Sequence, residues 1–294
     1  MKPFFGLRAH DFGTFPPAEL AARIASSGAT CVQLALAKAF PGGHLMPAEF
    51  GDTGLANIRS AFAAQGIQVF NVQDYAGTAV PQHVFALLLA LSNQLCQYQQ
   101  AVQRGDWSRS QNFCLLDYPM FELAGKTMVI VGYGSLGQAT AELAKAFGMR
   151  VLIAERPDVT EVRPGRIAFN NALALADVLS LHCPLTPATQ HLLNRERLAQ
   201  LKAGAVLVNT ARGGLIETEA LIAALKSGQL LAAALDVLET EPPPAEHPLL
   251  QCRLPNLLLT PHIGWASREA RTRMVLKIAA NIQNFVNSRM ETRR

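Results

Sequence analysis

The sequence predicts an α/β protein: a doubly wound parallel sheet (a Rossmann fold) with a second, smaller β/α domain. Three observations carry this prediction. Short apolar runs alternate with amphipathic helical segments, which is the succession expected of β/α units. After residue 127 these runs are continuous in Val, Leu and Ala, as in parallel strands covered on both faces. A glycine-rich turn closes the first of them, at residues 132–137. With 294 residues, the chain is long enough for two domains.

Composition narrows the class of protein. Half of the residues are apolar and 16% are charged, which is typical of a globular chain. The net charge of +4 is scattered, so it favours small anionic ligands over nucleic acid. The five cysteines are widely spaced and in no C-x-x-C arrangement, so we expect neither disulfides nor a metal site. The longest apolar stretch, Val84–Leu91, is too short to span a bilayer, and no signal-peptide pattern precedes it, so we expect a cytoplasmic protein without a membrane partner.

The N-terminal part predicts alternating strands and helices, with glycines ending the helices. The expected order is a strand at 4–9, a helix at 19–27, a strand at 30–36, a loop at 41–54, a helix at 55–65 and a strand at 67–72. This succession predicts a parallel sheet. His10 and Asp11, beside the first strand end, are either relics of a site or polar residues that cap a turn, and the second interpretation is favoured.

A long apolar helix is expected next, at residues 80–95. His83 lies on it, and because the helix is otherwise apolar, a structural role is favoured over a catalytic one. The segment that follows, residues 97–121, is rich in aromatic residues such as Trp107, Phe113 and Tyr118.

The glycine-rich turn has the spacing G-x-G-x-x-G, between a strand at 127–131 and a helix at 138–147. The first glycine allows a tight turn, the second lets the backbone approach a pyrophosphate, and the third lets the helix pack on the strand. The phosphates would lie at the helix N-terminus, where free N–H groups favour negative charge. We therefore expect this turn to bind a dinucleotide through Gly132, Tyr133, Gly134, Ser135, Leu136 and Gly137.

Glu155 ends the next expected strand, at 150–154. It lies about twenty residues beyond the glycines, where dinucleotide-binding units place an acid on the adenosine ribose hydroxyls. Its charge would repel a ribose 2′-phosphate, so NAD is expected as the cofactor and NADP is less favoured. The adjoining Arg156 weakens that preference.

Further apolar runs complete the expected sheet, and ligands of such sheets lie at the carboxyl ends of the strands. The expected strands are at 178–182, 205–209, 232–237 and 257–260, with helices at 194–201 and 221–227. Arg212 and His262 follow two of these strands, Asp236 lies at the end of a third, and Glu241 lies in the loop after it.

These side chains suit hydride transfer between a nicotinamide and a 2-hydroxy acid. The planar fork of Arg212 can hold the substrate carboxylate and polarise the 2-oxygen. His262 can exchange a proton with that oxygen, because imidazole titrates near neutrality. Glu241 on the far ring nitrogen would fix the tautomer and keep the histidine a proton donor for reduction.

The phrases "LVNTARGGLIE", "ALDVLETEPPP" and "LLTPHIGWAS", in this order after the glycine-rich unit, resemble the NAD-dependent D-2-hydroxyacid dehydrogenases over about residues 67–286. The resemblance implies that Arg212, Glu241 and His262 are catalytic and that Asp236 hydrogen-bonds the nicotinamide carboxamide. It implies an enzyme that interconverts a small 2-keto acid and its D-2-hydroxy acid. Other implied cofactor contacts are His182, Cys183, Pro184, Thr210, Ala211, Arg212 and His262.

Two finer features of the resemblance concern partners and substrate. The segment 97–121 resembles the arm through which family members dimerise, which implies a homodimer; the alternative is a connecting loop packed on its own domain. The stretch "WSRSQNFCLLDYPMFELAGKT" and Trp265 are closer to glycerate dehydrogenases, that is hydroxypyruvate or glyoxylate reductases, than to phosphoglycerate dehydrogenases.

The N-terminal part resembles another family. "GLRAHDFG", "AARIASSGATCVQLAL" and "IRSAFAAQGIQV" are similar to the opening β/α units of the sugar-phosphate isomerases and epimerases, which are TIM barrels. The glycine-containing loop that holds the substrate carboxylate in the dehydrogenases is not found there. The chain thus resembles a fusion, with its joint near residues 66–72. The expected domains are 1–74 on the substrate side, a NAD-binding domain at 75–266, and a helix within 267–294 that returns to the small domain.

Two alternative functions follow from this foreign N-terminus. One is an NAD(H)-binding sensor or corepressor-like protein that has lost catalysis. The other is a sugar-phosphate isomerase, which would need a metal site and most of a barrel. One scaffold hosts many functions, so the fold alone does not separate them.

Overall fold

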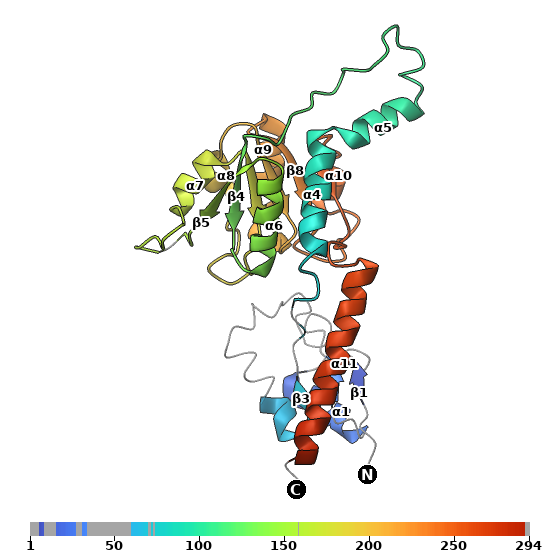
Figure 1. The fold of residues 1–294 in the computed structure, drawn as a ribbon, viewed down its shortest axis with the longest axis vertical. Coiled ribbons are helices and arrows are strands. Elements are labelled where there is room, and N and C mark those ends of the chain that lie inside the picture. Colours follow the sequence, from blue (N-terminus) through green and yellow to red (C-terminus); the bar gives the residue numbers. More distant parts are fainter. Residues whose placement is uncertain are drawn as a thin grey trace. The chain divides into compact units, whose positions relative to one another are not determined.

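The computed structural model describes residues 6–8, 16–27, 31–33, 60–69, 72, 74–157 and 159–291 (Figure 1). The chain divides into two compact units. The smaller unit comprises Met1–Tyr75, Leu185–Ala188 and Arg268–Arg294, and the larger comprises Ala76–Pro184 and Thr189–Ser267.

The smaller unit contains a three-stranded parallel sheet of β1 (Gly6–Arg8), β2 (Cys31–Gln33) and β3 (Gln68–Val69), in that order. Between the first two strands, α1 (Pro17–Ser26) starts with a proline, which suits the first helical position, and buries Leu20, Ala21 and Ile24. Residues 60–64 form a further helical segment. The predicted strand–helix succession is confirmed for these ranges. His10, Asp11 and the remaining parts of the predicted N-terminal elements lie outside the described residues.

The C-terminal helix, α11 (Arg268–Glu291), belongs to the same unit and confirms the helix predicted near the C-terminus. Ala270 in its first turn is buried. Arg273 Nε donates a hydrogen bond to Tyr75 O at 2.9 Å, which ties the helix to the end of the N-terminal stretch.

The larger unit is built on a six-stranded sheet in which all neighbouring strands are parallel, in the order β5-β4-β6-β7-β8-β9. The strands are β4 (Thr127–Val131), β5 (Arg150–Ala154), β6 (Val178–Leu181), β7 (Ala205–Asn209), β8 (Leu230–Leu235) and β9 (Leu257–Leu259). The chain leaves β4 in one direction across the sheet and later continues in the other, so the sheet is doubly wound as predicted. The crevice beside such a switch point is where these sheets bind ligands.

Helices cover both faces of this sheet (Figure 1). α4 (Ala79–Ser92) and α6 (Ser135–Ala146) pack against each other, with α6 on β4 and β5 and α4 on β7 and β8. Because β/α/β crossovers are right-handed, the reversal after β5 puts the later helices on the opposite face. These are α7 (Phe169–Leu175), α8 (Arg195–Ala199) and α9 (Thr218–Ser227).

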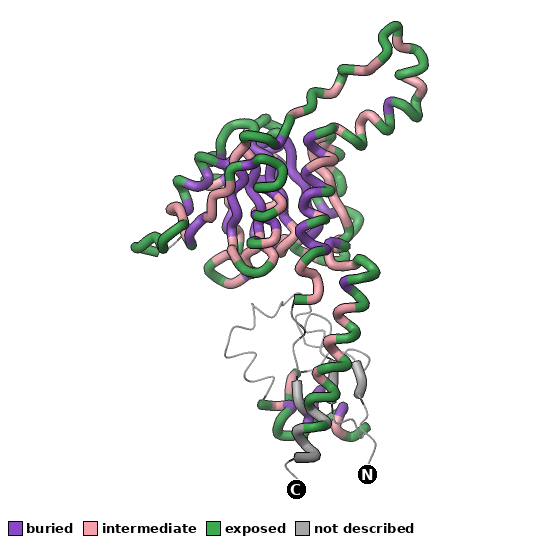
Figure 2. Tube along the Cα trace, in the orientation of Figure 1, coloured by how far each residue is buried: buried purple, intermediate pink, exposed green. Residues whose placement is uncertain are grey.

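The main core lies between the sheet and α4 and α6, where Figure 2 shows buried residues running through the strands. Alternate residues of β4, Met128 and Ile130, belong to this core, as do Val84 and Leu88 of α4. All four side chains are fully buried. Burial of each such side chain contributes about 1.5–3 kcal/mol, so this layer holds the strand ends in fixed positions.

The helix predicted at 80–95 is interrupted. α4 ends at Ser92, and α5 (Leu95–Gln103) begins after Gln94, which has φ +51°. Asn93 Nδ2 donates to Leu89 O at 3.1 Å, so its amide competes for a helix carbonyl at the break. Among the described residues, no single helix is long and apolar enough to cross a membrane, and only α4 and α5 together, bent by 58°, meet that test of length and composition.

Candidate active site

The glycine-rich turn joins β4 to α6 and lies against the end of β6. Gly132 has φ +94°, and a Cβ there would lie 2.5 Å from Cys183 N and 2.6 Å from His182 C. A Cβ on Gly137 would lie 2.1 Å from Gly132 O, so only glycine lets α6 approach the strand this closely. Gly134 has no atom within 4 Å of its Cβ position and so leaves open space beside the first turn of α6.

His182 and Cys183 are uncharged where they meet this turn. Loss of contact with water lowers the pKa of His182 to about 4 and raises the pKa of the Cys183 thiol to about 11. Ser180 Oγ lies 2.9 Å from His182 Nε2 and fixes the ring. Near pH 7 the residues after β6 that face the glycine-rich turn are therefore polar and uncharged.

Asp236 lies directly after β8, and its carboxylate is buried with four partners. Oδ1 accepts from Thr260 Oγ1 at 2.6 Å and Ile263 N at 2.9 Å, and Oδ2 accepts from Gly264 N at 2.8 Å. His83 Nε2 lies 3.2 Å from Oδ1 and 3.0 Å from Thr260 Oγ1. Burial alone would raise the pKa of Asp236, but these hydrogen bonds outweigh it and lower the pKa.

This network holds the segment that carries His262. His262 has φ +55°, and its N–H donates to Asp236 O at 2.8 Å. A Cβ on Gly264 would lie 3.0 Å from the Asp236 carboxylate. His83 is thus a structural partner at the edge of the site, in line with its expected role, and it links α4 to the loop after β9.

His262 and Glu241 form a direct pair. Nδ1 of the imidazole lies 2.5 Å from Glu241 Oε2, and Leu238 N donates to Glu241 Oε1 at 2.9 Å. Burial would raise the pKa of Glu241, but the bonds from His262 and Leu238 and the charges of His262 and Arg212 outweigh it and lower the pKa. An ionised carboxylate only accepts hydrogen bonds, so Nδ1 carries a proton and the other ring nitrogen, Nε2, is left for proton exchange.

Arg212 is brought to this pair by the loop after β7. Asn209 Nδ2 donates to Arg212 O at 2.8 Å, and Asn209 Oδ1 accepts from Ala211 N at 3.0 Å, so a buried amide sets the loop's shape. A Cβ on Gly213 would lie 1.9 Å from Leu238 C, so this loop touches the one that ends in Glu241. The loop that carries Arg212 therefore contacts the loop that carries Glu241, and the charge of Arg212 acts on the Glu241 carboxylate.

Sequence reasoning missed two supporting residues. Asn209 is the one polar residue of β7, a signal that could have identified it. Thr260 gave a weaker signal, as a hydroxyl directly after β9.

Glu155 follows β5 and lies beside the glycine-rich turn, since Val131 pairs with Ala154. Its side chain is buried, and Arg163 Nε donates to its Oε2 at 2.7 Å. The structure thus gives this acid a protein partner where the sequence predicts a ribose.

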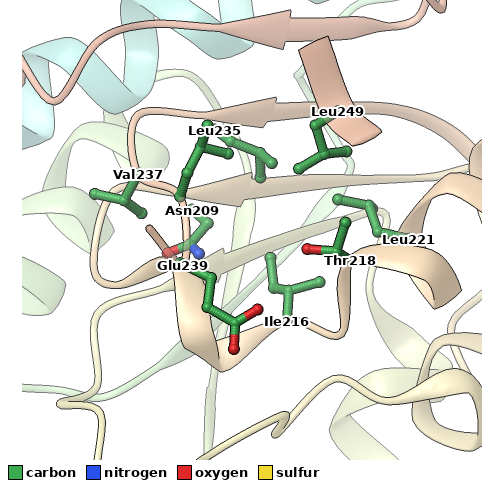
Figure 3. A pocket seen from close by; sticks show the side chains of 10 residues that line it. Asn209, Ile216, Thr218, Leu221, Leu235, Val237, Glu239 and Leu249 are labelled. Atoms are coloured by element: carbon green, nitrogen blue, oxygen red, sulfur yellow. The ribbon is translucent and has the colours of Figure 1, made fainter. Parts of the chain in front are cut away.

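A small pocket lies behind the Arg212 loop (Figure 3). Its volume is only about 10 Å³, and apolar side chains form most of its wall. That is roughly the room of one water molecule, so this pocket is too small for a substrate or a cofactor. Its lining residues are Asn209, Gly213, Ile216, Thr218, Leu221, Leu235, Val237, Leu238, Glu239 and Leu249.

A dinucleotide fits the residues along this edge of the sheet. Gly134 leaves open space at the start of α6, as a pyrophosphate requires. Within the described part of the chain, Thr210 Oγ1 is buried without a hydrogen-bond partner, which leaves it a donor for a ligand. No group of three His, Cys, Asp or Glu among the described residues could hold a metal ion.

The fold and these strand-end residues define a dinucleotide-dependent oxidoreductase. The sequence model of the family "D-isomer specific 2-hydroxyacid dehydrogenase, NAD binding domain" matches residues 85–264, and the chain belongs to this family. NAD is the cofactor of the matched domain.

Individual relatives agree with this assignment. The chain is 42% identical to a glycerate dehydrogenase of Methylorubrum extorquens, over 78% of this chain and 71% of the relative. It is 39% identical to a hydroxypyruvate reductase of Blautia hydrogenotrophica, over 76% and 69%. Among solved structures it resembles the TT0316 protein of Thermus thermophilus, with TM-score 0.70 and 38% identity, covering 87% of this chain and 75% of the other.

Proposed function

We propose that this protein reduces a small 2-keto acid of the hydroxypyruvate or glyoxylate type to the D-2-hydroxy acid with NADH, and catalyses the reverse reaction with NAD. The observation that carries this proposal is the His262–Glu241 pair at 2.5 Å, on a loop that contacts the Arg212 loop. The names of the relatives, glycerate dehydrogenase and hydroxypyruvate reductase, support the substrate class.

Arg212 anchors and polarises the substrate in this proposal. Its guanidinium matches a carboxylate in two-point contact and stays charged at any working pH. The same charge, placed near the 2-oxygen, draws electron density from the carbonyl carbon and favours attack there.

His262 supplies the proton. Nδ1–H is held by Glu241, so Nε2–H of the charged imidazole points its proton at the 2-oxygen, and the ring becomes neutral as the alcohol forms. The ionised Glu241 stabilises the charged ring before this transfer. The bound nicotinamide supplies the hydride that reaches the carbonyl carbon.

The cofactor is proposed to lie along the carboxyl ends of β4 to β9. The turn formed by Gly132, Tyr133, Gly134, Ser135, Leu136 and Gly137 would hold the pyrophosphate. Glu155 would lie nearest the adenosine ribose, and Asp236 nearest the carboxamide. Further proposed contacts are His182, Cys183, Pro184, Thr210, Ala211, Arg212 and His262.

The test is NADH oxidation with hydroxypyruvate, glyoxylate and phosphohydroxypyruvate, beside an NADH fluorescence titration. We expect turnover with the first two and little with the phosphorylated acid, and we expect His262→Ala to abolish turnover but not NADH binding. NADH binding without turnover in the unmodified protein would favour a sensor instead. Equal turnover in His262→Ala would refute the assigned proton donor.

We propose further that residues 1–74 form the substrate-side domain with the helix of 267–294, that 75–266 bind NAD, and that the N-terminal part derives from the opening units of a TIM barrel. The order β1-β2-β3 supports this origin, because consecutive strands are neighbours in such barrels, whereas a flavodoxin-like domain has the order 2-1-3. The test is to replace residues 1–66 with the substrate-domain segment of a relative. We expect a lower KM for the 2-keto acid with unchanged NADH affinity. An unchanged KM would refute the idea that residues 1–66 form a substrate-side segment taken from another family.

We also propose a cytoplasmic homodimer formed through the arm, residues 97–121. Phe113 is 91% and Leu116 79% exposed, and Trp107 Nε1 donates to Phe113 O at 2.9 Å, so the loop holds a defined shape that presents apolar groups. A second copy of the arm would cover them. The free thiols of the described cysteines support a reducing compartment.

A further inference from the structure

A loop, residues 156–166, follows β5, and hydrogen bonds to β5 hold both of its ends. Glu155 N donates to Ile167 O at 2.8 Å, and Ile167 N donates to Ile153 O at 2.9 Å. Ile167, directly after this loop, therefore pairs with β5, the strand from which the loop departs. Side chains on this loop, among them Arg163 and Arg166, have defined positions at the carboxyl end of β5.

The carboxylate of Glu155 is enclosed by this loop. Its Oε1 accepts from Arg156 N at 2.8 Å and from the Arg163 guanidinium. Its Oε2 accepts from Arg163 Nε at 2.7 Å and Arg163 N at 3.3 Å, and Arg166 Nε lies 3.8 Å away. Four donors fill the lone-pair sites that a carboxylate offers. Its side chain is 1% exposed.

The Glu155 carboxylate is therefore ionised, but its acceptor sites are already occupied by hydrogen bonds within the protein. The bonds from Arg163 hold its pKa far below the ordinary range, even though burial opposes this. A ribose hydroxyl that approaches meets no unfilled acceptor on this carboxylate. It meets instead the Arg163 side chain, which is 49% exposed and still has N–H donors beyond those directed at Glu155.

The charge beside this carboxylate is also changed. Arg163 and Arg166 both form ion pairs with the one Glu155 carboxylate, so these three side chains together carry one positive charge in excess. This cluster adjoins Gly132, the first residue of the cofactor turn, because Val131 and Ala154 are paired. A 2′-phosphate would enter a positive environment, whereas an isolated acid would repel it.

We propose that Arg163 sets the coenzyme selectivity: it neutralises Glu155 and offers its remaining N–H groups to a ribose 2′-phosphate, so that the protein accepts NADPH as well as NADH. This inference rests on the proposed function only in requiring a dinucleotide at the glycine-rich turn. It replaces the expectation that Glu155 alone disfavours NADP.

The experiment compares ADP-ribose with 2′-phospho-ADP-ribose by calorimetric titration, and NADH with NADPH by fluorescence titration, without substrate. For the unmodified protein we expect the two Kd values of each pair to lie within tenfold. Arg163→Gln should raise the Kd of each 2′-phosphorylated ligand at least tenfold relative to the Kd of its unphosphorylated counterpart. Glu155→Gln should lower the Kd of the 2′-phosphorylated ligand relative to that counterpart.

Two further variants keep the result interpretable. Arg163→Lys retains the charge and should keep most of the 2′-phosphate affinity. Arg195→Gln removes an exposed arginine from α8 and should leave the ratio unchanged. The proposal would be overturned if, in the unmodified protein, the Kd of the 2′-phosphorylated ligand exceeded that of its unphosphorylated counterpart more than a hundredfold. It would also be overturned if Arg163→Gln left this ratio of Kd values unchanged. If neither ligand of a pair bound, the dinucleotide site itself, and the proposed function with it, would fail.

Discussion

At the residue scale, Glu241 is the group whose charge matters most to the proposed proton transfer. Glu241→Gln keeps a hydrogen-bond acceptor near His262 Nδ1 but removes the negative charge that favours the charged imidazole. We expect kcat for reduction to fall by about 10²-fold or more, with NADH affinity unchanged. Steady-state kinetics and NADH titration measure the two effects.

A matched control lies two residues away in the same loop. Glu239 is exposed and lies 3.4 Å from His191 Nε2 rather than from His262. Glu239→Gln should keep the unmodified kcat. Equal losses in both variants would show that the charge of the loop, and not the His262 pair, is responsible.

Gly213 controls how closely the Arg212 loop approaches the Glu241 loop. In Gly213→Ala the new methyl group would meet Leu238 C at 1.9 Å, so the two loops must separate. A displacement of about 1 Å at such a group costs about 10²-fold in rate, and we expect a loss of that order in kcat/KM with NADH binding retained. Gly77→Ala, at a position with open space, is the control. Full activity in Gly213→Ala would contradict this role.

The charged residues of the site could be predicted from the sequence more readily than the residues that hydrogen-bond to them and hold them in place. Arg212, Glu241 and His262 could be predicted because polar residues interrupt apolar runs at strand ends. His83 could be placed on a helix, but its bond to Thr260 spans 177 positions, and no local pattern encodes such a contact. The Glu155–Arg163 pair was equally hidden, because it depends on the path of an irregular loop.

At the element scale, Asp177 fixes the start of three neighbouring strands. Its Oδ2 accepts from Thr127 N at 2.8 Å and its Oδ1 from Lys202 Nζ at 2.6 Å. Its backbone oxygen accepts from Val206 N at 2.9 Å. Burial would raise the pKa of Asp177, but the bonds from Lys202 and Thr127 outweigh it and lower the pKa.

This lowered pKa predicts a pH-dependent contribution to stability. The folded pKa lies below the unfolded value of about 3.9, so the contribution is full above that pH and is lost as the pH falls through the folded pKa. Asp177→Asn should lower the free energy of unfolding by about 1–3 kcal/mol at neutral pH, and the difference should shrink below pH ~4. Urea unfolding at several pH values tests this, with Asp117→Asn, at an exposed position, as control. A loss independent of pH would contradict it.

The elements themselves divide into predictable and unpredictable parts. The strands after residue 127 are continuous apolar runs, so their positions were clear; only β8 begins earlier than predicted, at Leu230. The break between α4 and α5 was not predicted, because Gln94 adopts a left-handed conformation that glutamine rarely takes. There the geometry of the arm overrides the apolar periodicity.

At the scale of the whole molecule, the arm predicts the oligomeric state. Replacing Phe113 and Leu116 together with serine removes the most exposed apolar groups of the arm and should convert the proposed dimer to single chains. Light scattering after size-exclusion chromatography measures this. Leu175→Ser, at a position 43% exposed on α7, should leave the dimer intact. A single-chain mass for the unmodified protein would refute the dimer.

The return of Ile167 to β5 has a further consequence, for aggregation. β5 is an edge strand, and unpaired edge backbone is a template for strand addition by other chains. Ile167 occupies the end of that edge, and the exposed Arg150 places a charge at its beginning. The opposite edge, β9, has only three residues. Both margins of this sheet therefore discourage uncontrolled strand pairing between molecules, the kind of association that leads to fibres.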